Sequence, residues 1–360
     1  MTNINKQKGF TLTELMVGVT IGLIGSIIIF QALQNSTGIV ENVSSGNDAN
    51  QNGAIAAYMI ERDARIAGFG LNQQDLMTCT IQGTRVDPGT GTEMPISGIS
   101  LNPAIITQGA SGAPDRLVIT YASSDNSFIA PAKITEAYPG DTTPIKVSNR
   151  YGFQNGGLFL ISDGTTCTLR QIKELPSGGA SDNIVHVQGT YKDQYNQDMP
   201  IKYNNAAGEG VLYPVNSRIY NVGGTPVSNE YSIQNNNLVV TNGFTGETSI
   251  LVTDVLNFQV VYGMNVGGAL NWTTTAPTTA AQFNDLSALK FAVLARSNTK
   301  NHQRDANNIC TTTTVNPSWS GTSNGDTPEN FNMTDADWRC YRYKVFESTA
   351  FLKNMVWRPT

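Results

Sequence analysis

A single carboxylate in an apolar segment is the residue most able to do chemistry in this chain. Glu14 follows Phe10, Thr11, Leu12 and Thr13, and the surrounding apolar run continues to Leu33. As a helix, residues 10–33 would reach about 36 Å, enough to cross a bilayer core. An acid inside such a helix costs roughly 2.5–3.5 kcal/mol on insertion scales, so a functional role is the default interpretation. Snorkelling of Glu14 to the membrane surface is the simpler alternative.

Four cysteines are the next candidates, and their spacing favours disulfides over metal binding. Cys79, Cys167, Cys310 and Cys340 form no C-x-x-C pair, and only two histidines accompany them. An even cysteine count in an exported chain predicts two disulfides. Three connectivities are possible. We favour Cys79–Cys167 with Cys310–Cys340, because the second pair closes a loop rich in Asn, Thr and Gly that has little apolar content.

Signatures of catalysis are weak. The sequence has neither a phosphate-binding G-x-x-x-x-G-K-[ST] loop nor an H-E-x-x-H zinc motif. Residues 321–325 fit G-x-S-x-G, but they lie in a Thr/Asn/Gly-rich stretch without the strand-to-helix context of a nucleophile elbow. His186 alternates within a strand-like run, which favours a core or edge histidine over a base. We expect no enzymatic activity, no cofactor and no metal.

The elements that would position these residues indicate an α+β fold. Residues 34–70 are predicted to continue the apolar helix as an amphipathic helix, ended by Gly68 and Gly70. Ser44–Asp48 is poor helix material, so the helix is either held there by packing or interrupted. Ile55, Met59, Arg62 and Ile66 share one face, which we expect to pack on the head's sheet and partly on neighbouring subunits.

After Gly70 the sequence changes to short strand-like runs separated by polar turns. An amphipathic helix followed by antiparallel strands predicts a helix lying on one face of a β-rich head covering residues 71–360. We expect loops at 82–114, 265–285 and 311–334. The clearest predicted strands are 116–121, 157–162, 183–187, 218–222, 230–233, 237–240, 258–262, 289–296 and 341–347.

Composition and charge agree with an extracytoplasmic protein. The 360 residues are 39% hydrophobic and only 14% charged, with 34 glycines, which is typical of a β-rich, loop-rich chain. The net charge of −5 gives no reason to expect nucleic acid on the head. Lys6 and Lys8 precede the apolar run and residues 1–9 hold no acid, which predicts a cytoplasmic N-terminus and a single pass through the inner membrane.

The N-terminal block closely resembles a type IV prepilin signal. Residues 8–14 read Lys-Gly-Phe-Thr-Leu-Thr-Glu, and the apolar run leads onward without the small-residue cleavage site of a secretory signal. A plain membrane anchor would explain the length but not Glu14. The resemblance implies that a prepilin peptidase removes residues 1–9 by cutting between Gly9 and Phe10. It also implies that Phe10 is N-methylated and that residues 10–33 stay in the mature protein as a transmembrane and assembly helix.

Later segments resemble PilW-type minor pilins, which are related to the J-type pseudopilins of type II secretion. The family carries an R-D-x-R-x-A-G run at the end of its long helix, and this chain has it at residues 62–68. Cys167 falls four residues after Asp163 rather than directly after it, a departure that bears on the geometry of its disulfide. The further matching segments are 51–53, 160–163, 255–263 and 343–354. The cluster of Arg62, Asp63 and Arg65 fits either a partner-binding face or a solvated helix end.

The resemblance implies a non-catalytic minor pilin that helps to initiate a type IV pilus and sits at its tip. Glu14 would neutralise the new amine of Phe10 on a neighbouring subunit and set the stagger between helices. Implied partners are other minor pilins, the major pilin, the prepilin peptidase, the inner-membrane assembly platform, the inner membrane itself and a large tip adhesin. The alternatives are a J-type pseudopilin of a type II secretion system and, from another class, a membrane-anchored periplasmic enzyme.

Overall fold

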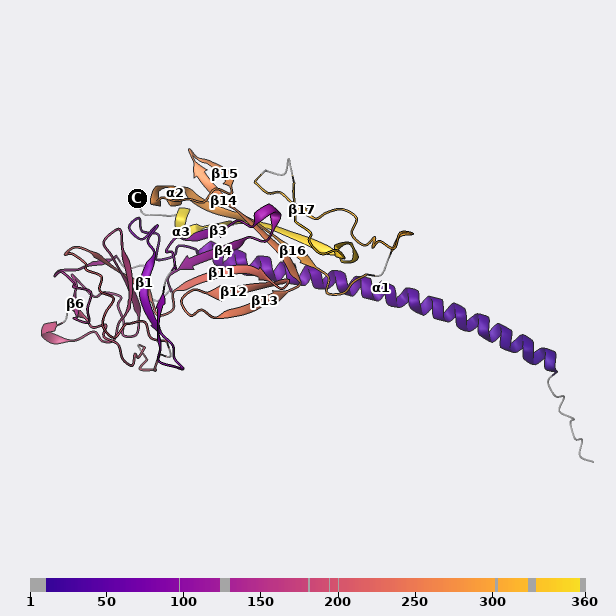
Figure 1. Ribbon diagram of the computed structural model, residues 1–360, viewed down its shortest axis with the longest axis horizontal. Helices are drawn as coiled ribbons and strands as arrows, with labels where there is room; N and C mark the ends of the chain where they lie inside the picture. The colour runs from indigo at the N-terminus through magenta and orange to yellow at the C-terminus, as the bar shows by residue number, and fades with distance from the viewer. Residues whose placement is uncertain are drawn as a thin grey trace, which may run out of the picture.

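The computed structural model consists of one long helix and a β-rich head (Figure 1). The side chains of residues 34–45 are not described, although their backbone is helical. The residues that the structure describes are 11–96, 98–123, 130–180, 182–193, 195–199, 201–301, 304–322 and 328–356.

Helix α1 (Leu12–Ile66) runs unbroken for 55 residues, about 82 Å at 1.5 Å per residue. It passes through Ser44–Asp48 without interruption, and the head already buries the helix at Ala49. Packing therefore begins directly after the weak stretch. Gly68 and Gly70 follow the helix with φ of 74° and 68°. Because this left-handed conformation suits glycine, the predicted helix stop is confirmed.

Two antiparallel sheets enclose the main core together with the second half of α1. The four-stranded sheet has the order β15 (Ala269–Thr273), β14 (Val255–Val266), β16 (Leu286–Arg296), β19 (Tyr343–Phe351). The five-stranded sheet has the order β13 (Thr248–Thr253), β12 (Asn237–Asn242), β11 (Val227–Gln234), β4 (Arg116–Tyr121), β3 (Ala104–Thr107). Ile60, Leu117, Tyr231, Phe258 and Phe291 meet in the core between these elements.

A second lobe carries a six-stranded sheet and lies beyond the C-terminal end of α1 (Figure 1). Its order is β2 (Glu93–Ile96), β1 (Ile81–Val86), β8 (Cys167–Gln171), β7 (Leu158–Ser162), β10 (Arg218–Gly223), β5 (Ala132–Lys133). Only β1 and β8 pair in parallel within this sheet. We call this part of the head the distal lobe, because the apolar half of α1 extends from the opposite end of the molecule.

The remaining elements are short. Strand β6 (Ile145–Lys146) pairs with β9 (Asn183–Ile184), and β17 (Ser318–Trp319) pairs with β18 (Glu329–Asn330). The short helices are α2 (Ala280–Asp285), α3 (Lys353–Val356), η1 (Ala110–Gly112), η2 (Gly178–Ala180) and η3 (Trp338–Cys340). The α+β prediction of a long helix packed on an antiparallel β-rich head is confirmed.

The predicted loops at 82–114 and 265–285 were wrong in part. The first contains β2, β3 and most of β1, and the second contains β15 and α2. In the described part of residues 311–334, the only strands are β17 and β18. These strands are only two to six residues long, and most of them pair with the strand next to them in sequence. Strand β1 pairs in addition with β8, which is distant in sequence. Local propensity is therefore a poor guide to them.

The face of α1 that packs on the head also differs from the prediction. Ile55 and Ile66 are 41% and 40% exposed, whereas Ala56, Ile60 and Ala64 are fully buried. Apart from Ile60, the buried face uses small side chains, which let the helix approach the sheets closely, and Ile55 and Ile66 face outward. The prediction that Ile55 and Ile66 bury against the head's own sheet was wrong, whereas Met59 is half-buried. Packing of this stripe on neighbouring subunits stays a prediction.

Candidate assembly site

The first part of α1 is an apolar helix that the head does not cover. The 22 residues Leu12–Leu33 are long and apolar enough as a helix to span a membrane, and the rest of the chain buries none of them. Water is an unfavourable environment for so much apolar surface. This half of α1 therefore requires lipid or other subunits around it.

Glu14 lies in the first turn of this helix and closes a capping box with Thr11. The Thr11 amide donates to Glu14 Oε2 at 3.0 Å, and the Glu14 amide donates to Thr11 Oγ1 at 3.3 Å. Among the residues that the structure describes, no cation pairs with Glu14. Gly9 and Phe10 lie outside the described residues, so cleavage between them and methylation of Phe10 stay predictions.

Asp63 anchors the other end of α1 to the head. Its side chain is fully buried, and it accepts hydrogen bonds from Arg62 Nε at 3.0 Å and Arg62 Nη2 at 2.8 Å. Strand β11 adds two donors, Asn229 Nδ2 at 3.1 Å and Tyr231 Oη at 2.6 Å. Burial and the Asp63 charge raise the pKa of Tyr231, so the phenol stays a donor. A buried carboxylate satisfied in this way fixes the rotation of the helix on the sheet.

The cluster of Arg62, Asp63 and Arg65 was interpreted from the sequence as a partner-binding face or a solvated helix end. Neither interpretation describes Asp63 correctly. Arg65 pairs with Glu61 one turn earlier, as expected of a solvated helix face. The hydrogen bond with Asp63 raises the pKa of Arg62, whose side chain is 53% exposed. Asp63 itself points into the head. The sequence marks it only as one acid in a charged run, and nothing local identifies Asn229 and Tyr231 as its partners.

The C-terminal tail of the chain caps α1. Asn354 Nδ2 donates to the carbonyl of Ile66 at 3.0 Å, and the Gly68 amide donates to the carbonyl of Thr120 at 2.9 Å. Ser348 Oγ on β19 donates to Glu61 Oε2 at 3.0 Å. The helix end is therefore tied to both sheets by hydrogen bonds.

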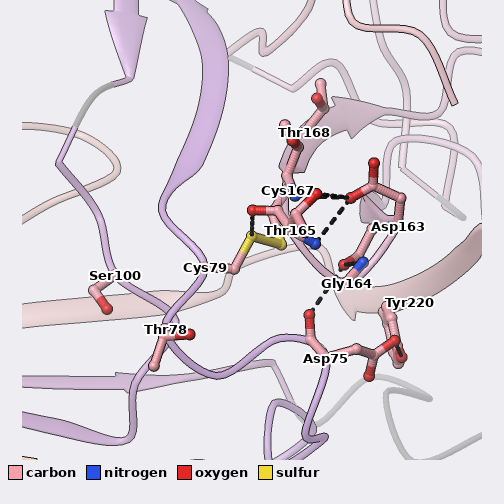
Figure 2. The surroundings of a disulfide bond; sticks show 12 residues. Asp75, Thr78, Cys79, Ser100, Asp163, Gly164, Thr165, Cys167, Thr168 and Tyr220 are labelled. Atoms are coloured by element: carbon pink, nitrogen blue, oxygen red, sulfur yellow. Dashed lines mark hydrogen bonds between the residues drawn. A yellow bond between two sulfur atoms is a disulfide. The ribbon is translucent and has the colours of Figure 1, made fainter. Parts of the chain in front are cut away.

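The distal lobe contains the first disulfide (Figure 2). Cys79 and Cys167 are bonded, joining the segment before β1 to the start of β8. The extra residues between Asp163 and Cys167 form a tight turn in which Asp163 Oδ1 accepts from the Thr165 and Thr166 amides at 2.9 and 2.8 Å. The turn places Cys167 opposite Ser162 in the β7–β8 pair. The departure from the family spacing is thus absorbed in a hairpin.

The second disulfide joins Cys310 to Cys340, so the favoured pairing is confirmed. The segment that it closes covers the outer face of the four-stranded sheet, where Trp319 and Phe331 pack over Val261 and Leu294. This segment supplies few large apolar side chains of its own, so a covalent link is a reasonable way to hold it in place.

The candidate catalytic residues do not assemble into a site. His186 is buried, its Nε2 lies 2.9 Å from the carbonyl of Thr143, and burial lowers its pKa to about 4, so it is a neutral core histidine. His302, the second histidine of the sequence, and residues 323–325 of the G-x-S-x-G segment lie outside the described residues. Within the described part of the chain, no group of three or more His, Cys, Asp or Glu residues could hold a metal ion.

Comparison with known protein families gives two matches. Residues 4–30 match the prokaryotic N-terminal methylation motif, and residues 219–354 match type IV pilus-assembly protein W. The second match begins in β10 and ends in α3, so it covers most of both core sheets. No curated protein and no solved structure matches significantly. The predicted resemblance to PilW-type pilins with a prepilin-type N-terminus is confirmed.

Proposed function

We propose that this PilW-like, pilus-related pilin is a non-catalytic minor pilin that helps to initiate a type IV pilus and occupies its tip. The prepilin-type signal and the apolar helix support anchoring in the inner membrane before assembly. Residues 1–9 form the cleaved leader, 10–33 the membrane and assembly helix, 34–70 its amphipathic continuation, and 71–360 the periplasmic head. The N-terminus faces the cytoplasm.

The position of the distal lobe is the observation that carries the tip assignment. The lobe lies beyond the C-terminal end of α1, along the direction in which the helix points (Figure 1). In a fibre, the N-terminal helices would run parallel in the core, and each would point away from the cell. The region beyond the C-terminal end of one helix would then be occupied by the subunits that were assembled earlier. A subunit with a bulky lobe there fits best where no earlier subunit stands, which is the tip.

Glu14 supplies the attraction that draws the next subunit into register. It is exposed and has no cationic partner among the described residues, and an uncompensated carboxylate in an apolar bundle is costly. The amine that cleavage creates on Phe10 of a neighbouring subunit would neutralise it. During assembly the partners of this chain are other minor pilins, the major pilin, the assembly platform and a large tip adhesin. The prepilin peptidase acts on the chain before assembly.

The test is localisation in cells that carry an epitope inserted at Gly179, where a side chain would meet no atom within 4 Å. We expect label at one end of each pilus, and loss of pili when the gene is deleted. Label along the whole shaft, or normal pili without the gene, would refute the proposal. Intact pili with failed protein secretion would instead indicate a secretion pseudopilin.

The epitope-tagged strain also tests the proposed pairing of Glu14 with the amine of Phe10. Glu14→Ala should leave membrane insertion intact and a mature N-terminus beginning at Phe10 by mass spectrometry, yet prevent incorporation into pili. Thr20→Val is the matched control, because the Thr20 hydroxyl lies in the same helix but already donates to the carbonyls of Met16 and Val17. Normal incorporation of the Glu14→Ala chain would rule out the pairing role.

A further inference from the structure

Two hollows adjoin each other on the distal lobe, remote from the membrane helix. They are open depressions of about 580 and about 210 Å³ and share Gln154, Asn155 and Asp193 in their linings. We call them together the distal groove. The larger hollow falls within the size range of about 300–1,000 Å³ that is usual for small-molecule sites. Neither the membrane helix nor the attachment of α1 involves this groove.

The lining of the distal groove is polar and balanced in charge. The larger hollow has two cationic side chains, Lys173 and Lys192, and two anionic ones, Glu174 and Asp193. Lys192 is already engaged, with Nζ 3.3 Å from Asp198 Oδ1 and 3.3 Å from the Asn196 carbonyl. With Asp198 included, two ammonium groups face three carboxylates, so the groove has no net attraction for an anion.

Amide groups are available for a neutral polar ligand. Asn155 Oδ1 accepts from the Leu175 amide at 3.0 Å, and within the described part of the chain its Nδ2 has no partner. The Gln154 side chain likewise has no hydrogen bond to a described residue. Asp193 uses Oδ1 to accept from the Tyr195 and Gln197 amides at 2.9 and 2.8 Å, so Oδ2 remains as an acceptor. Such a set can both donate to and accept from hydroxyl groups.

An exposed aromatic ring completes the smaller hollow. Tyr195 is 74% exposed and lines it, together with backbone from Gly152, Gly156 and Gly224. A phenol ring with one open face can stack on the apolar face of a sugar ring, and the glycines let a ligand approach the main chain closely. Lipids and apolar peptides would leave the amides and carboxylates without partners.

We propose that the distal groove binds a neutral oligosaccharide, with Tyr195 stacking on one sugar ring and Gln154, Asn155 and Asp193 bonding its hydroxyls. The inference goes beyond the pilus role and does not depend on it, since binding can be measured on the isolated chain while pilus assembly is measured in cells. At a pilus tip, the distal lobe would present this groove away from the cell.

The test uses the full chain in lauryldimethylamine oxide, because a glycosidic detergent would compete for the groove. Binding is measured on an array of neutral and of sialylated or sulfated oligosaccharides, followed by titration of the best soluble neutral glycan. Tyr195→Ala removes the ring. Gly224→Tyr adds bulk to the wall without backbone strain, since Gly224 lacks a positive φ and a Cβ there meets no atom within 4 Å.

Two control variants match these changes outside the groove. Tyr151 is 76% exposed and does not line either hollow, and Gly179 is as open as Gly224. We expect at least about tenfold weaker binding in Tyr195→Ala and Gly224→Tyr, and unchanged binding in Tyr151→Ala and Gly179→Tyr. Absence of glycan binding, a preference for acidic glycans, or binding that both groove variants retain would each overturn the proposal.

Discussion

Replacing Gly53 with alanine should destabilise the head, against the rule that alanine favours helices. Gly53 lies where α1 crosses β16 and β19. A Cβ at this position would lie 2.2 Å from Phe346 Cε2 and 3.2 Å from Ala295 Cβ. The first distance is more than about 1 Å below the optimal carbon–carbon separation of about 3.5–4.0 Å. Phe346 packs against the main core, so its ring cannot move aside without cost.

The magnitude follows from two opposing effects. Alanine gains about 1 kcal/mol over glycine in a helix interior, whereas an extra methyl group in a packed contact costs about 1–3 kcal/mol. For so close a contact we expect the upper part of this range, which leaves a net loss of about 1–2 kcal/mol. At about 2–4 °C per kcal/mol, the melting temperature should fall by several degrees.

Gly46→Ala is the matched control in the same helix. A Cβ at Gly46 meets no atom within 4 Å, so this variant should show only the gain in helix propensity and melt slightly higher. Thermal unfolding of the full chain, followed by tryptophan fluorescence, measures both variants. In a Phe346→Ala background the crowding is removed, and Gly53→Ala should then cease to destabilise. A rise in melting temperature for Gly53→Ala equal to that of Gly46→Ala would refute the reasoning.

Ile60→Asp should unfold or strongly destabilise the head, whereas Ile66→Asp should change the melting temperature little. The reason is that Ile60 is fully buried and Ile66 is 40% exposed. Similar losses of stability in both variants would contradict the assigned helix face. Burial raises the pKa of Asp115 from 3.8 to about 6, so its contribution to stability is complete below about pH 4 and is lost as the pH rises through 6. The free energy of unfolding relative to Asp115→Asn should therefore increase on going from pH 7 to pH 4, and a constant difference in urea titrations would count against the shift. Replacing both Cys310 and Cys340 with serine should cost about 3–4 kcal/mol in the chain-entropy model, as measured by denaturant unfolding without reductant; an unchanged midpoint would show that the loop is held by its packing alone.

The sequence by itself determined the features that depend on neighbouring residues. The apolar run from Phe10 to Leu33 and the acid within it predict a membrane helix with an assembly role, because length and polarity are local properties. The glycines after Ala67 predict where the helix ends for the same reason, since glycine adopts the left-handed backbone more readily than other residues. The favoured disulfide pairing was also accessible, because it rests on the lack of apolar residues in one loop.

Only the tertiary structure decided which face of α1 is buried and what Asp63 does. Large aliphatic residues suggested one face, but the sheets accept the face with Gly53, Ala56 and Ala64, since close approach requires small side chains. Asp63 became an anchor because β11, more than 160 residues later, brings Asn229 and Tyr231 to it. The distal groove likewise joins loops between residues 152 and 225 that no local pattern relates. Contacts between distant segments depend on how the whole chain packs, and local periodicity does not encode them.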